Sequence, residues 1–260
     1  MPLTYGEYLK VPELLSLQQP VSGGRDHDEM LFIVIHQVYE LWFRQQIHEL
    51  GFLQSSLEAG NDVDALRTLK RKLTILKTMV GQIDVLETMT PVHFLGFRGL
   101  LQNSSGFQSA QFREYEIMLG SRRRGVISHY PEGSPERATL ESLWARRTAW
   151  QSFLMWLRGK GHAVPEECIQ VPMQALPEPN DAAQSMLLNL YREHPSERAV
   201  CELLVDLDEG LQEWRYRHVK MVERTIGFKQ GTGGSPGVAY LRETLFRPLF
   251  PDLWAIRTQL

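Results

Sequence analysis

Apolar residues recur every three or four positions through most of the chain, which is the period of an amphipathic α-helix. Across residues 26–57 this period continues without a proline, so we predict one long helix there. Across 66–83, leucine, valine and isoleucine alternate at spacings of three and four, a seam typical of long helices packed nearly antiparallel. The sequence contains neither a two-residue hairpin signal nor a strand–helix alternation. The pattern therefore predicts an all-α protein, built as a helical bundle.

The first residues of two further helices are also recognisable. The Ser-Pro-Glu sequence at 134–136 combines an N-cap, a first-turn proline and an acidic first turn. It opens a tryptophan-rich helix that we expect to end near the Gly-Lys-Gly sequence of 159–161. The Pro-Ser-Glu sequence at 195–197 opens another helix, which we expect to end at Gly227.

Three stretches rich in glycine, proline or arginine separate these helices. Residues 88–106 indicate a loop with a short helix inside, and 121–135 indicate an exposed connection whose arginines at 122–124 are solvated. Residues 163–181 hold four prolines and form a second linker. Because the helices on both sides of that linker are amphipathic and need a partner, we predict a single domain over 1–260.

The composition narrows the class of protein and of partner. Hydrophobic residues make up 43% and charged residues 23%, as in an ordinary soluble globular protein. A net charge of −3 gives no electrostatic reason to expect nucleic acid or an anionic membrane. The two cysteines do not form a disulfide framework, the first residues do not resemble a signal peptide, and no run approaches the ~20 apolar residues that span a bilayer. We expect a cytoplasmic protein.

One histidine, His218, lies on the apolar face of a predicted helix. His218 belongs to a series that begins at Leu204, includes Trp214 and repeats at spacings of three and four. A neutral imidazole in such a place needs a hydrogen-bond partner or a metal, and alone it is more often a satisfied core residue. The glycine-dense sequence 231–237 follows the helix and would let backbone approach a ligand, with the Thr232 hydroxyl available, but it also fits a helix C-cap and turn.

A second histidine, His36, lies among aromatic and aliphatic residues upstream. No His-Glu-x-x-His motif is present, and His36 and His48 are twelve positions apart, so a zinc site there is poorly supported. The aromatic neighbours instead fit a flat apolar ligand that is hydrogen-bonded at one edge.

Arg98 follows two phenylalanines in the sequence Phe-Leu-Gly-Phe-Arg. It is either a surface arginine lying over its own hydrophobic neighbours or a clamp for a carboxylate, whose two oxygens match the guanidinium. Tyr5 and Tyr8 are three apart and pack locally unless the N-terminal segment reaches a pocket.

Taken together, several blocks of the sequence resemble the tryptophan 2,3-dioxygenase family. The resemblance extends over almost the whole chain, and the order and spacing of the blocks make it specific. The blocks are residues 3–5, 27–42, 97–98 with 104–109, 214–218 and 227–237.

The resemblance implies a haem-dependent, all-helical homotetramer, with long helices enclosing the pocket of one non-covalent haem b per subunit. Such enzymes use O2 to open the pyrrole ring of L-tryptophan, giving N-formyl-L-kynurenine. It further implies that residues 1–25 contact a neighbouring subunit, whose site would receive Tyr5 and Tyr8.

The resemblance also assigns roles around the cofactor and the substrate. It makes His218 the axial ligand of the haem iron, with Trp214 one turn before it also in the cofactor site. His36 becomes the distal histidine that hydrogen-bonds the indole N–H, and it is the predicted catalytic residue. Ser105 and Gly106 fall at the distal face of the haem.

Four further residues are assigned to substrate binding in the same way. Arg98 matches the arginine that pairs with the substrate carboxylate, and Thr232 matches a threonine that contacts the amino-acid head group. Phe32 and Phe94 fall where aromatic rings wall the indole.

Two departures from the family pattern leave the identity of the substrate undetermined. Phe94 stands where many bacterial members have tyrosine, and Ile35 replaces a residue that is often polar. The near alternative is a haem-dependent monooxygenase that acts on a substituted tryptophan in natural-product assembly. An alternative of another class is a haem sensor or carrier without turnover.

Overall fold

The computed structural model describes residues 2–171, 178–231 and 237–260, and within these ranges its regular structure is helical, with no strand. The predicted all-α class is confirmed. The α-helices are α1 (Tyr5–Leu9), α2 (Val11–Leu15), α3 (Asp28–Glu58), α4 (Asp62–Leu86), α5 (Pro91–Arg98), α6 (Ala110–Leu119), α7 (Pro135–Trp144), α8 (Ala149–Gly159), α9 (Asp181–Glu193), α10 (Pro195–Ile226), α11 (Val238–Arg242) and α12 (Pro251–Ala255). Short 3-10 helices lie at Gly99–Leu101, Gly106–Gln108, Arg124–His129, Glu166–Cys168 and Ile256–Gln259.

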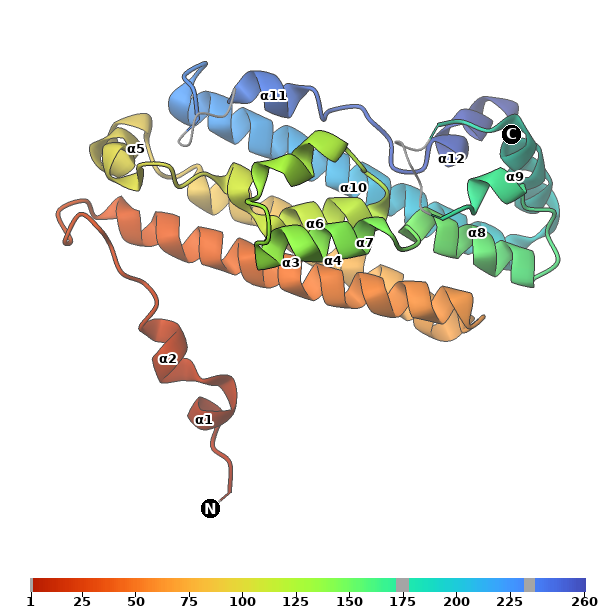
Figure 1. Ribbon diagram of the computed structural model, residues 1–260, viewed down its shortest axis with the longest axis horizontal. Helices are drawn as coiled ribbons and strands as arrows, with labels where there is room; N and C mark the ends of the chain where they lie inside the picture. The colour runs from red at the N-terminus through yellow and green to blue at the C-terminus, as the bar shows by residue number, and fades with distance from the viewer. Residues whose placement is uncertain (1, 172–177, 232–236) are drawn as a thin grey trace.

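Three long helices, α3, α4 and α10, run along the longest axis of the molecule and form its frame (Figure 1). The seam predicted across 66–83 lies within α4, where Leu69, Leu76 and Ile83 are almost fully buried against the other two. Each such leucine or isoleucine contributes about 1.5–3 kcal/mol relative to an exposed position. At Gly210 of α10 an added Cβ would lie 3.0 Å from Leu76, so the two helices approach closely there.

The prediction of a single tryptophan-rich helix from 134 to about 160 is wrong, because the structure divides this stretch into α7 and α8. The break lies at a second cap. The Thr148 hydroxyl accepts the N–H of Gln151 at 3.2 Å, and the Gln151 side chain accepts the N–H of Thr148 at 2.9 Å. This capping box starts α8 afresh and lets it turn away from α7.

The exposed connection predicted for 121–135 is also wrong in part. Arg122 is only 2% exposed, and its guanidinium donates to the carbonyl oxygens of Trp144 at 2.8 Å and Arg146 at 2.5 Å. These carbonyls belong to the C-terminal end of α7 and the turn after it, where backbone acceptors lack helical partners. Arg122 is therefore a helix-capping residue of the interior and is not solvated.

The N-terminal segment with α1 and α2 projects away from the bundle (Figure 1). Tyr5 and Tyr8 are 78% and 72% exposed, so the pocket of their own chain does not receive them. The segment joins the bundle through Glu29, whose buried carboxylate accepts the N–H groups of Val21 and Ser22 at 2.8 and 2.9 Å. Contact of this arm with a neighbouring subunit stays a prediction.

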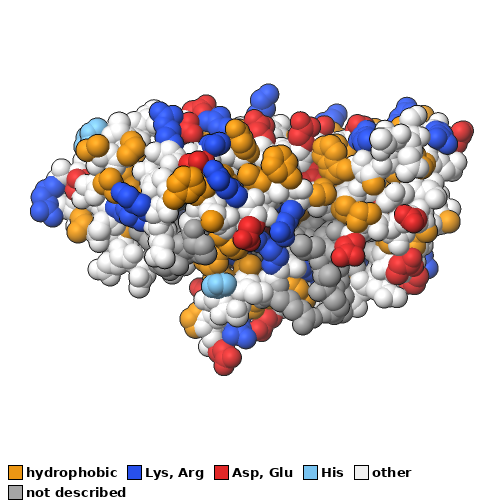
Figure 2. All heavy atoms as spheres, turned by 90° about the horizontal axis from the view of Figure 1, so that it is seen from above, with side chains coloured by type: hydrophobic (Ala, Val, Ile, Leu, Met, Phe, Trp, Pro, Cys, Tyr) orange, Lys and Arg blue, Asp and Glu red, His pale blue; other side chains and the backbone are white. Residues whose placement is uncertain are grey.

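The remaining boundaries follow the sequence closely. The helix predicted over 26–57 is α3, the short helix inside 88–106 is α5, and α10 ends where Gly227 takes a positive φ of 60°. None of the described helices combines the length and the apolar character that a membrane span requires. Over the described part of the face in Figure 2, basic and acidic side chains are interspersed.

Candidate functional site

A largely apolar cavity of about 260 Å³ lies between α3, α5, α6 and α10. Eight of the eleven residues predicted for the site line it, although their sequence positions span most of the chain. These eight are Phe32, His36, Phe94, Arg98, Ser105, Gly106, Trp214 and His218.

His218 lies near the C-terminal end of α10 and faces this cavity. The Trp214 indole, one turn earlier, lies parallel to the imidazole, with 5.4 Å between ring centroids and 5° between the planes. Burial lowers the pKa of His218 to about 4, and the nearby His36 and Arg113 act in the same direction. Within the described part of the chain, neither ring nitrogen takes part in a hydrogen bond. His218 is thus a neutral imidazole with a free lone pair, which is the form that ligates a metal.

His36 lines the same cavity from α3, and its orientation is fixed by the backbone. Its Nδ1 lies 2.7 Å from the carbonyl oxygen of Phe32, which can only accept, so Nδ1 carries the proton and Nε2 is left as an acceptor. Burial lowers the pKa of His36, which keeps the ring neutral at physiological pH. The site therefore offers one hydrogen-bond acceptor inside an apolar space.

Aromatic rings make the wall beside His36. The Phe32 ring lies 4.1 Å from the imidazole, and Phe94 and Phe97 lie 5.7 and 5.6 Å from Phe32 between centroids. Phe94 and Phe97 are themselves edge to face at 5.4 Å. This cluster joins α3 to α5 and presents flat apolar surface to a ligand.

Arg98 closes the cavity at the end of α5. Its guanidinium donates to the carbonyl oxygen of Gln230, which holds α5 against the segment before the glycine-dense sequence. Gly231 and Gly237, the first and last residues of that sequence, line the cavity, and a Cβ on Gly237 would lie 2.8 Å from the Lys229 carbonyl oxygen. Thr232, between these two glycines, lies outside the described residues.

Ser105 and Gly106 contribute the turn between α5 and α6. The Ser105 hydroxyl accepts the N–H of Phe107 at 3.3 Å and so starts the 3-10 helix of Gly106–Gln108 at the cavity wall. Both predicted residues are therefore at the cavity, held by local capping.

Sequence reasoning missed a buried charge cluster on another wall. Glu116 of α6 pairs with Arg113 at 2.6 Å and with Arg215 of α10 at 2.9 Å, and Arg123 lies 3.6 Å from it. Burial alone would raise the pKa of Glu116, but the arginines outweigh it and the pKa is lowered. The Nε atoms of Arg113 and Arg215 are buried without a hydrogen-bond partner in the described part of the chain. Three arginines around one carboxylate leave surplus positive charge beside the cavity.

The comparisons with known proteins agree with the predicted resemblance. The family model described as tryptophan 2,3-dioxygenase matches residues 1–138 and 178–260. The chain belongs to the tryptophan 2,3-dioxygenase family. It is 54% identical to the tryptophan 2,3-dioxygenase of Herpetosiphon aurantiacus over 99% of this chain and 98% of that protein. It is 56% identical to that of Anaeromyxobacter sp. strain K over 98% and 95%, and 40% identical to that of Kineococcus radiotolerans over 99% and 91%.

Membership of the tryptophan 2,3-dioxygenase family confirms the resemblance but leaves the role of each residue to be argued from geometry. The buried arginines carried a weak signal in the sequence. Arg113 and Glu116 are three apart on α6, a spacing that lets opposite charges pair, whereas Arg215 has no such local signal.

Proposed function

We propose that this chain is a haem-dependent dioxygenase that opens the indole ring of L-tryptophan with O2, giving N-formyl-L-kynurenine. One observation carries the proposal. Two neutral imidazoles, His36 and His218, line one apolar cavity with Arg98 at its edge, and the two imidazoles are set up differently. His36 has one nitrogen committed to a backbone carbonyl, whereas both nitrogens of His218 are free of hydrogen bonds to described residues.

The donor set of the cavity fits haem b. His218 would hold the iron, Trp214 would keep the imidazole in place, and the apolar walls suit a porphyrin. The buried N–H groups of Arg113 and Arg215 that lack partners provide positive charge for the carboxylates of haem b. When bound, haem supplies the redox chemistry that makes O2 reactive towards the indole.

The remaining residues of the cavity fit tryptophan as the substrate. The indole would lie against Phe32 and Phe94, with its N–H donated to Nε2 of His36. Arg98 would pair with the carboxylate, because only one of its five donor hydrogens is used by the Gln230 carbonyl. Thr232 would contact the amino-acid head group.

The contribution of the protein to the reaction is then positioning in a site without bulk water. His36 and Arg98 hold the two ends of the substrate, so the C2–C3 bond of the indole is presented in one orientation. Aromatic side chains such as Phe32, Phe94 and Phe97 exclude water from the reacting face. The hydrogen bond that Nε2 of His36 accepts from the indole N–H holds the ring in that orientation.

We also propose that the chain works as a homotetramer in which the N-terminal arm covers a neighbouring subunit. The exposed arm supports this, because it carries apolar side chains that water would otherwise contact, among them Leu3, Tyr5, Tyr8, Leu15 and Leu17. Deleting residues 2–16 should lower the molecular mass measured by light scattering to that of a smaller assembly. An unchanged tetramer would contradict the role of the arm.

The experiment that tests the activity follows both oxygen atoms. The haem-loaded, reduced protein is mixed with L-tryptophan under ¹⁸O2, and the product is analysed by mass spectrometry. Two labelled atoms in the product support the dioxygenase. One labelled atom would show a monooxygenase, and an unchanged substrate would show a sensor or carrier, so either result would overturn the proposal.

A further inference from the structure

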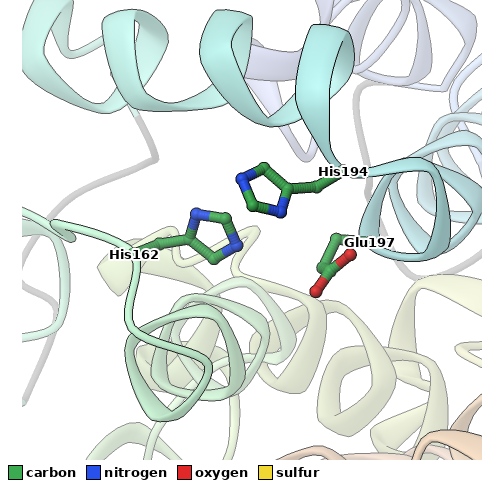
Figure 3. Close-up of side chains that lie close together, drawn as sticks. All are labelled: His162, His194 and Glu197. Carbon is green, nitrogen blue, oxygen red and sulfur yellow. The ribbon is translucent and has the colours of Figure 1, made fainter.

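A second group of metal-binding side chains lies at the other end of α10. His162 follows α8, His194 is the N-cap of α10, and Glu197 stands in its first turn (Figure 3). Their ligand atoms, one per residue, all lie within 4.8 Å of one another, and all three side chains are partly buried. Among the described residues this is the one place where three or more such side chains converge.

Two helix termini hold the histidines in place. The N–H of His162 donates to the carbonyl oxygen of Leu157 at 3.1 Å, as part of the turn that ends α8, where Gly161 has a φ of 93°. The N–H of His194 donates to the carbonyl oxygen of Leu190 at 2.9 Å, so this residue ends α9 and begins α10. The convergence is therefore built from regular structure, and ordering the site requires little backbone rearrangement.

The three side chains have no other evident partner. The imidazoles of His162 and His194 lie edge to face, with centroids 4.7 Å apart and planes at 80°. None of the three side chains forms a hydrogen bond or an ion pair with another described residue. Lys160, a cation whose charge acts on His162, is paired with Asp62 at 2.6 Å. Two imidazoles and one carboxylate thus meet without a donor from the described part of the protein between them.

The electrostatics keep the His162 imidazole available. Burial lowers the pKa of His162, and His194 and Lys160 lower it further, whereas Glu197 opposes them. The ring is therefore neutral at physiological pH, and a cation placed among the three residues would remove the unfavourable interactions that they share.

We propose that His162, His194 and Glu197 bind a zinc ion that fastens the end of α8 to the junction of α9 and α10. Two imidazole nitrogens and one carboxylate are ligands that zinc takes, with water in the fourth position, whereas calcium and magnesium require more oxygen ligands. Tetrahedral bonds of about 2.0–2.1 Å place ligand atoms about 3.3 Å apart, so small side-chain rotations complete the site.

This site is independent of the cavity and of the proposed reaction. His194 and His218 are 24 positions apart on α10, which corresponds to about 36 Å along the helix axis. His162 also lies in the segment 139–177, outside the residues that the family model matches. The ion would stabilise this end of the bundle without contacting substrate or haem.

The test uses haem-loaded, tag-free protein, so that neither His218 nor an added histidine tag competes for zinc. After treatment with a chelator, the protein is titrated with zinc chloride in a calorimeter. We expect one zinc per chain, with affinity at least about tenfold weaker in each of His162→Ala, His194→Ala and Glu197→Gln. The matched control is His48→Ala, an exposed histidine on α3, which should bind zinc like the parent.

A second readout separates binding from damage to the fold. Zinc should raise the melting temperature of the parent and of His48→Ala, but not that of Glu197→Gln, which keeps the shape of the side chain. The haem absorption spectrum should be the same in all variants. If the parent binds no zinc, or if the three variants bind it as tightly as His48→Ala does, the proposal is overturned.

Discussion

Two pairs of histidines, one towards each end of α10, show how spacing selects a ligand. His36 and His218 line a cavity of about 260 Å³, so a flat molecule can enter between the elements that carry them. The ligand atoms of His162 and His194 lie within 4.8 Å of each other and of Glu197, which leaves room for an ion only. The same side chain is thus suited to a planar cofactor at one end and to a bare cation at the other.

The partners of each pair reinforce this difference. In the cavity, the Phe32 carbonyl fixes the tautomer of His36, and the carboxylate nearby, Glu116, is already bound by arginines. At the other end Glu197 forms no ion pair with a described residue and adds a third ligand to the two imidazoles. Haem iron can take a single imidazole from the protein, whereas zinc takes imidazole and carboxylate ligands together, so the two groups suit different metals.

The largest effect on cofactor binding should come from removing His218, and His194 at the other end of α10 provides the comparison. His218→Ala should lower haem affinity by more than about 100-fold, because the proposed ligand of the haem iron is lost, whereas His194→Ala should keep haem. Absorbance of the Soret band after reconstitution measures both. A normal haem spectrum in His218→Ala would contradict the assignment of the ligand.

The next comparison is between Glu116, beside the cavity, and Glu197, at the N-terminal end of α10. Glu116→Gln should lower the free energy of unfolding by about 3–5 kcal/mol, because Arg113 and Arg215 lose their buried counter-charge. Glu197→Gln should change it by less than about 0.5 kcal/mol in metal-free buffer. Urea unfolding followed by circular dichroism measures both, and equal losses would show that burial of Glu116 is not what distinguishes the two.

Arg98 tests whether the cavity is shaped for an amino acid. Arg98→Ala should weaken binding of L-tryptophan by about 2–3 kcal/mol, since the carboxylate loses a charged partner. Binding of tryptamine, which has no carboxylate, should change much less. Spectral titration of the haem-loaded protein measures both ligands, and Arg98→Lys serves as the control that keeps the charge. Similar losses for the two ligands would rule out the clamp.

The smallest effect concerns the protonation of His36. Only the neutral ring can accept the indole N–H, and burial lowers the pKa of His36 below the ordinary value. A histidine of ordinary pKa would weaken tryptophan binding about fourfold between pH 8 and pH 6. We expect a change smaller than fourfold, with the greater part of the loss appearing at lower pH. The measurement is the affinity for L-tryptophan between pH 8 and pH 6. A fourfold loss by pH 6 would contradict a buried, neutral His36.

The elements that were predictable from sequence are those that a local pattern defines. The apolar period defines α3, α4 and α10 because one stripe of each helix is buried along its whole length. The break between α7 and α8 was missed because apolar residues continue across Thr148, and the cap signal there competes with that period. Arg122 was missed because its partners are carbonyls about twenty residues downstream, which no local pattern reveals.

The residues of the candidate sites also separate into those that could be predicted from the sequence and those that could not. The resemblance to the family named His36, Arg98 and His218, and the fold brings all three to one cavity. The charge cluster was not predictable, because Arg215 reaches Glu116 across 99 positions of sequence. The convergence of His162 with His194 likewise depends on how two helix ends meet, which spacing along the chain does not specify.

The most direct measurement is anomalous diffraction from crystals of the haem-bound protein soaked in zinc, recorded at the iron and zinc edges. The iron peak should lie at coordination distance from a ring nitrogen of His218, and the zinc peak should lie among His162, His194 and Glu197, about 36 Å away along α10. An iron peak bonded to any other residue would contradict the account of the cavity and of the chemistry built on it.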